Sequence, residues 1–140
     1  MRDVFYFARD EIKLEDIKQL AEDLGYKAYL APNAQANPNI RSLVVHYSEA
    51  DYWRCLEITE DDFLEEAEKA KLRSMGPHTG FQIKYMGISM PDLRTFLKFV
   101  LERHGGWVGC NDEWERVYLL ENIELLQCFG DEKPSSKLAT

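Results

Sequence analysis

Residues 81–110 of the chain read FQIKYMGISMPDLRTFLKFVLERHGGWVGC, and this stretch decides the fold. Its first five residues alternate apolar and polar side chains, which is the period of a strand with one solvated face. Residues 93–104 place their apolar side chains on one helical stripe, and Ser89 opens a capping box before it. Gly105-Gly106 ends the helix, and residues 107–110 return as a strand. The stretch therefore predicts a strand, an amphipathic helix and a second strand in that order.

The sequence on the N-terminal side of this stretch predicts further helices and strands. Residues 14–24 carry an apolar helical stripe, and Gly25 supplies the left-handed position that ends such a helix. Residues 32–39 are rich in proline and asparagine, which predicts a loop. Thr59 opens another capping box and predicts a helix over residues 60–72. The remaining strands are expected at 4–8, 26–30, 40–47 and 52–58.

These elements predict one α+β domain. The expected order is βαβββαβαβα, with a mainly antiparallel sheet and the two amphipathic helices, 14–24 and 93–104, packed on it. The last helix of this order is short and is expected from the leucines and the isoleucine that follow Tyr118. The domain spans residues 1–130, and residues 131–140 are expected to form a mobile tail because they hold little apolar content.

Composition narrows the classes of partner and compartment. The 140 residues include 25 acids and 17 bases, giving a net charge of −8, which disfavours the phosphate backbone of nucleic acid. Cys55, Cys110 and Cys128 are odd in number and form no CxxC pair, which favours a reducing compartment. The N-terminus lacks the apolar segment of a signal peptide, and no apolar run is long enough to span a membrane. We expect a soluble, cytoplasmic protein that contacts neither nucleic acid nor membrane.

Two acidic segments are candidates for partner binding. The first lies on one face of the expected helix 60–72 and consists of Glu60, Asp61, Asp62, Glu65 and Glu66. It forms a negative ridge that suits a basic partner, although a solvated helix face explains the same pattern about as well. In the second segment a tryptophan lies among acidic residues, and tryptophan is one of the residues enriched in binding hot spots. It consists of Asp112, Glu113, Trp114 and Glu115.

The chain offers no constellation typical of catalysis. A thiol at Cys110 activated by His104 can be drawn, but the acidic residues that follow Cys110 disfavour a thiolate. The glycines at 105–109 follow a helix, whereas a phosphate-binding loop follows a strand and opens a helix. The histidines lack the spacing of metal ligands. We therefore expect no catalytic residue, no cofactor and no metal.

The segment GGWVG at 105–109, followed by CNDEWERVY at 110–118, resembles small immunity proteins of bacterial polymorphic toxin systems. The resemblance covers the C-terminal part of the domain. It implies a small, acidic, cytoplasmic α+β protein that binds and neutralises a cognate toxin protein in competition between bacteria, often by occluding the active site of the toxin. Such families carry no catalytic motif.

The sequence thus predicts an immunity protein that inhibits a toxin by protein–protein interaction through an acidic surface. Two other functions stay open. One is a small-ligand-binding or regulatory domain with a pocket between sheet and helix, and the other is an enzyme that depends on Cys110 and His104.

Overall fold

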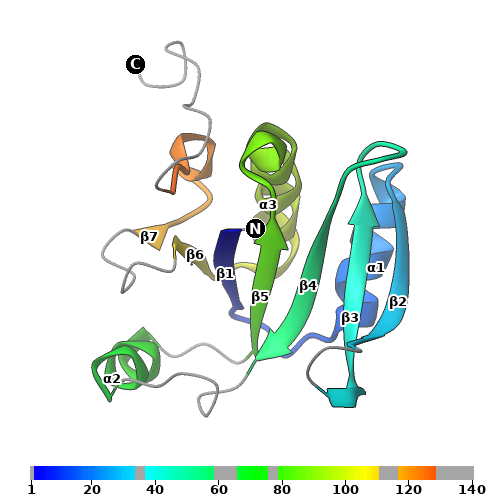
Figure 1. Cartoon of the computed structure of the whole chain (residues 1–140). Coiled ribbons are helices and arrows are strands. Elements are labelled where there is room, and N and C mark those ends of the chain that lie inside the picture. The colour runs from blue at the N-terminus through cyan, green and yellow to red at the C-terminus, as the bar shows by residue number, and fades with distance from the viewer. Residues whose placement is uncertain (1, 34–36, 59–65, 76–78, 111–116, 129–140) are drawn as a thin grey trace.

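The computed structural model describes residues 2–33, 37–58, 66–75, 79–110 and 117–128 (Figure 1). The strands run β1 (Arg2–Ala8), β2 (Lys27–Asn33), β3 (Asn37–His46), β4 (Tyr52–Ile58), β5 (Thr79–Tyr85), β6 (Trp107–Cys110) and β7 (Val117–Tyr118). The helices are α1 (Leu14–Asp23), α2 (Glu66–Met75) and α3 (Met90–His104), with short 3₁₀ turns η2 (Gly87–Ser89) and η3 (Ile123–Leu125).

The described strands form one antiparallel sheet in the order β2-β3-β4-β5-β1-β6-β7. From β2 to β5 each strand pairs with the next strand along the chain, which is a meander interrupted only by α2. β1 lies between β5 and β6 and is antiparallel to both. The prediction of an α+β fold with a mainly antiparallel sheet is therefore confirmed.

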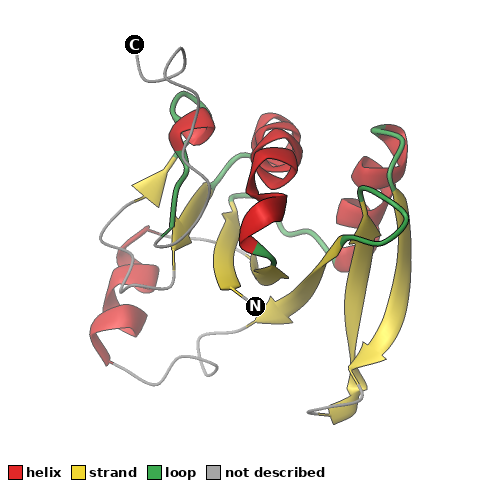
Figure 2. Cartoon of the chain, turned by 45° about the horizontal axis from the view of Figure 1, so that its top comes forward, coloured by secondary structure: helices red, strands yellow, loops and turns green. Residues whose placement is uncertain are grey.

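One face of the sheet is covered by α1 and α3, and Figure 2 shows both helices against the strands. Alternate strand residues point toward these helices, so Val4, Tyr6 and Ala8 of β1 are fully buried. Both helices bury the stripes that the sequence predicts. These are Leu14, Ile17, Leu20 and Ala21 of α1, and Leu93, Phe96, Leu97, Val100 and Leu101 of α3. Trp53 of β4 fills the centre of this layer, with its ring centroid 5.4 Å from that of Phe96.

The turn from α3 into β6 depends on two glycines with positive φ. Gly105 has φ 67° and Gly106 has φ 91°, both in the region that favours glycine. A Cβ at Gly106 would lie 1.9 Å from the carbonyl oxygen of Phe7, so this position also admits no side chain. The predicted helix stop is confirmed, and its second glycine lets β6 approach β1.

Three local predictions are wrong. The expected loop 32–39 is shorter, because β2 runs through Asn33 and β3 begins at Asn37, with a register shift after Pro32. The hydroxyl of Ser89 does not cap α3, since it lies 2.6 Å from the hydroxyl of Tyr47 and is buried there. The expected last helix is replaced by β7 and the 3₁₀ turn η3.

The helix expected over residues 60–72 is described only from Glu66 onward, as α2. In Figure 1, α2 lies apart from α1 and α3, below β6 and β7. The expected tail 131–140 lies outside the described residues.

Candidate functional site

The predicted partner-binding residues fall mostly outside the part of the chain that the structure describes. Glu66 is the one described member of the first acidic segment, and its side chain is 83 % exposed. Its carboxylate lies 3.8 Å from the ammonium group of Lys69, which is a weak contact at the surface. Glu60, Asp61, Asp62 and Glu65 lie outside the described residues, as do Asp112, Glu113, Trp114 and Glu115. Of the predicted partner-binding residues, the structure therefore places Glu66 alone.

Cys110 does not meet His104 as a nucleophile would meet its base. Cys110 forms a disulfide with Cys128, and the two Cα atoms are 5.8 Å apart. A disulfide sulfur carries no thiolate, so in this form Cys110 cannot attack a substrate. The cysteine spacing gave no sign of this pair, and the interpretation of the cysteines as reduced residues is wrong for these two.

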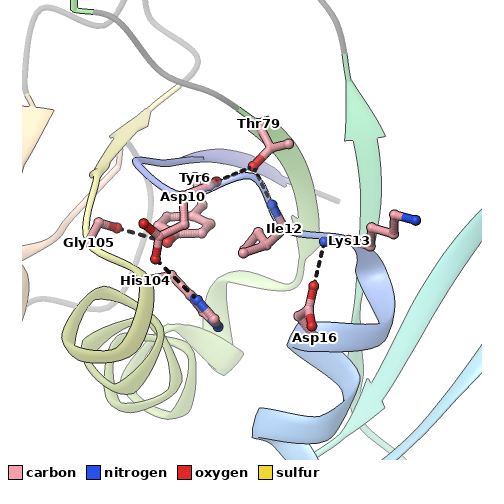
Figure 3. A network of polar contacts seen from close by, with 8 residues as sticks. All are labelled: Tyr6, Asp10, Ile12, Lys13, Asp16, Thr79, His104 and Gly105. Carbon is pink, nitrogen blue, oxygen red and sulfur yellow. Dashed lines mark hydrogen bonds and ion pairs between the residues drawn. The ribbon is translucent and has the colours of Figure 1, made fainter.

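His104 belongs to a polar network at one end of the sheet (Figure 3). Its Nδ1 lies 3.8 Å from a carboxylate oxygen of Asp10, which is an ion pair when the imidazole is protonated. Next to it, the Tyr6 hydroxyl donates to the carbonyl of Gly105 at 2.8 Å. The Thr79 hydroxyl donates to the carbonyl of Asp10 at 2.9 Å and accepts from the backbone N–H of Ile12 at 3.3 Å. These contacts join the β1–α1 connection to β5 and to the end of α3, which is a structural task.

The two reactive groups beneath α1 and α3 are held neutral by burial. Cys55 is the free cysteine, and burial raises its pKa to about 12, so the thiol stays protonated at neutral pH. Burial, and then the negative charge of Asp10, raises the pKa of the Tyr6 phenol. Neither group is prepared to act as a nucleophile or a general base.

A different surface stands out, namely the segment 119–128, which we call the C-terminal loop. Three of its leucines are exposed to solvent, Leu119 and Leu120 at 40 % and Leu125 at 38 %. Two exposed carboxylates, Glu121 and Glu124, lie between them in the sequence. Apolar side chains beside charges on an exposed surface are typical of protein-binding sites.

The C-terminal loop is held firmly although it is exposed. Ile123 and Leu126 are fully buried in the core, and the disulfide ties the end of the loop to β6. The buried guanidinium of Arg94 donates from Nε to the carbonyl of Leu126 at 2.5 Å. A second contact joins the loop to α3, since the Lys98 ammonium lies 3.0 Å from the Glu124 carboxylate. The exposed leucines therefore project from a rigid base.

The sequence signals for this loop are only partial. Its leucines suggested a helix with a buried face, whereas the β7 strand and a turn place Leu119 and Leu120 outward. The turn is fixed by the Asn122 side chain, which accepts from the backbone N–H of Leu119 at 2.6 Å. An asparagine in a short segment bounded by two glutamates is a turn signal that helical periodicity outweighed.

Over the described ranges, no three His, Cys, Asp or Glu side chains gather as a metal site requires. No helix in those ranges is long and apolar enough to cross a membrane.

Comparison with known proteins finds no family model, no curated protein and no solved structure that matches the chain.

Proposed function

We propose that the chain binds and neutralises a bacterial toxin protein, acting as an immunity protein. The observation that carries the proposal is the C-terminal loop, which presents three leucines and two carboxylates from a disulfide-anchored base. The resemblance of residues 105–118 to immunity proteins supports the same role, and this segment leads directly into the loop.

The rigidity of the loop favours tight binding. A partner that docks on it does not have to order a mobile segment, because core residues and the disulfide already fix the backbone. Each exposed leucine gains apolar burial on contact, while Glu121 offers a partner to a basic side chain at the rim. The loop is thus suited to a basic surface with an apolar centre.

The acidic residues outside the described ranges belong to the same proposal. Asp112, Glu113, Trp114 and Glu115 precede the C-terminal loop by a few residues, so the proposed surface is continuous with them along the chain. The ridge Glu60, Asp61, Asp62, Glu65 and Glu66 supplies a second negative contact.

The test uses the purified full chain and the toxin domain encoded by the neighbouring gene. We expect a complex by calorimetry and loss of toxin activity in the mixture. The double variant Leu119→Ser/Leu120→Ser should weaken binding by at least about tenfold, because hot-spot side chains lose their burial. Ile88→Ser is the matched control, since Ile88 is 75 % exposed but lies in η2. Absence of binding to the neighbouring gene product would overturn the proposal.

We also propose a cytoplasmic location, and the disulfide makes it testable. Disulfides persist mainly in oxidising compartments. Trapping thiols with an alkylating agent at the moment of cell lysis reports the state of Cys110 and Cys128 in the cell. A cytoplasmic protein is expected to show them reduced, and the loop would then be held by buried Ile123 and Leu126 and by the Arg94 contact alone. A bonded pair would place the protein in an oxidising compartment and overturn the cytoplasmic location.

A further inference from the structure

The face of the sheet opposite α1 and α3 carries a patch of rings and positive charges. Strand residues alternate in direction, so the neighbours of buried Trp53 and Cys55 on β4 point away from the helices. The register aligns these residues across four neighbouring strands and β1. We call this set the open-face patch, and it consists of Lys27, Tyr29, His46, Tyr52, Arg54, Lys84 and Asp3.

Three of its side chains form a row of rings. The centroids of Tyr29 and His46 are 5.8 Å apart with an interplanar angle of 25°, so these rings stack. The centroids of His46 and Tyr52 are 5.4 Å apart. Tyr29 is 50 % exposed, which is high for a tyrosine on a strand. The row therefore offers ring surface to a ligand.

Two positive charges of the patch repel each other in the free protein, which lowers its stability. Arg54 lies directly opposite Lys84 in the register of β4 and β5, and like charges at such positions repel. Asp3 lies opposite Lys84 on β1, but within the described ranges no ion pair joins them or Arg54. The Nε of Arg54 is buried and finds no hydrogen-bond partner among the described residues. A carboxylate brought between the exposed parts of Arg54 and Lys84 would relieve their repulsion, although the buried Nε is out of its reach.

We propose that the open-face patch docks an acidic segment of a partner protein. A carboxylate of that segment lies between Arg54 and Lys84, and a neighbouring apolar or aromatic side chain lies on the rings of Tyr29 and His46. The proposal does not rest on the immunity role, because this face lies away from the C-terminal loop and has the opposite charge.

The charge of the whole chain favours a polypeptide over nucleic acid. The patch carries three lysine and arginine residues against one aspartate, on a chain of net charge −8. A nucleic-acid strand brings a regular series of phosphates, most of which would meet negative surface. An acidic peptide needs only the local pair Arg54 and Lys84, so repulsion by the rest of the protein is smaller.

The experiment titrates ¹⁵N-labelled full chain with a random copolymer of glutamate and tyrosine and follows amide shifts by NMR. We expect shifts concentrated on β2, β3, β4 and β5 that weaken as salt is added. Arg54→Gln/Lys84→Gln should reduce the affinity by at least about tenfold, because a charge pair is lost. Lys18→Gln is the matched control, because Lys18 lies on α1, away from the open face. This variant should bind the copolymer as the wild type does. Tyr29→Ala provides a second variant at an exposed position and should also weaken binding.

Each other outcome counts against the proposal. Absence of shifts on β2 to β5, or equal binding by the double variant whose spectrum shows a folded chain, would overturn it. A short oligothymidylate that shifts the same amides at lower concentration than the copolymer would overturn the choice of a protein partner. Shifts that grow with protein concentration alone would make a second copy of the chain the occupant instead.

Discussion

The two faces of the sheet are built from the same strands but obey different demands. On β4, Trp53 and Cys55 are fully buried beneath the helices, whereas Tyr52 and Arg54, which alternate with them, are partly exposed on the other side. On the covered face, side chains have to pack without gaps and exclude water, because a cavity or an unpaired charge there is strongly destabilising. On the open face, Phe7 and Trp107 form a small buried cluster, whereas β2 to β5 carry a row of rings and the like charges of Arg54 and Lys84. The difference teaches that packing explains the covered face and the Phe7–Trp107 cluster, but does not explain why Arg54 stands opposite Lys84.

The largest effect is expected where α3 returns into the sheet and closes the covered face. Gly106→Ala places a Cβ 1.9 Å from the carbonyl oxygen of Phe7 at a positive φ, so β6 has to move away from β1. We expect a loss of about 4 kcal/mol or more in the free energy of unfolding, measured by urea denaturation. Gly25→Ala is the control, because φ is 87° there but no atom lies within 4 Å. It should cost about 1 kcal/mol. Equal losses in both variants would show that the close approach is unimportant.

The comparison of the faces is tested directly by truncating one strand aromatic on each. Phe81→Ala empties a fully buried site on the covered face and should reduce the free energy of unfolding by about 3–5 kcal/mol. Tyr29→Ala removes a half-exposed ring on the open face and should change the free energy of unfolding by about 0.5 kcal/mol. Urea denaturation of both variants measures the difference. Similar losses would remove the distinction between the faces.

Reduction of the disulfide tests how far the C-terminal loop depends on its link to the sheet. Cys110 and Cys128 are 18 residues apart, and opening a loop of that size should cost about 3 kcal/mol by the chain-entropy model. Urea denaturation with and without a phosphine reductant measures the loss. The variant Cys110→Ser/Cys128→Ser should be insensitive to the reductant. A wild-type chain equally insensitive would contradict a stabilising role for the bond.

Alkaline pH should destabilise the covered face through its buried acids. The unfolded chain ionises its cysteines near pH 8.5, whereas folded Cys55 keeps its proton up to about pH 12, so this stabilisation is complete below pH 8.5 and is lost as pH rises. Tyr6 adds a similar loss above about pH 10. The free energy of unfolding should fall by about 1 kcal/mol per pH unit for each group. In Cys55→Ala the decline should begin only near pH 10, and a decline from the same pH as wild type would exclude Cys55 as its source.

The smallest expected effect is a gain in the free energy of unfolding, and it comes from a substitution on the open face. Arg54→Gln removes the repulsion of Lys84, so the free protein should gain about 0.2–1 kcal/mol. Lys84→Gln removes the same repulsion but also the attraction of Asp3, and its stability should change less. Thermal and urea denaturation compare the two variants. A clear loss of stability in Arg54→Gln would mean that the arginine serves the fold.

The sequence was sufficient to predict the covered face, because the apolar residues of its helices and strands recur at regular intervals. The apolar stripes of α1 and α3 and the alternation in β5 each follow from burying one side of a regular element. The glycine pair at 105–106 marked the helix stop correctly, because only a backbone without Cβ accepts those φ angles.

The missed features depend on contacts between distant residues. Ser89 has the sequence of a helix cap, but a buried hydroxyl partner on Tyr47, 42 residues away, redirects it. The link between Cys110 and Cys128 depends on β7 and η3 bringing the chain back to β6, and no local spacing encodes that return. The open-face patch could not be predicted from the sequence for a similar reason. Its charges are spread over four strands and gather only when the register is known.

The central position of β1 has a consequence for synthesis of the chain. β1 precedes both strands that flank it, and the hydrogen bond from Tyr6 to Gly105 spans 99 residues. At ribosomal rates of about 5–20 residues per second, β1 waits about 5–20 s for β6 to be made. Until β5 is made, the aromatic residues of β1 have no native neighbour strand, and until β6 is made one edge of β1 stays unpaired. The nascent chain therefore has to keep its earliest strand from pairing with other chains before the sheet can close around it.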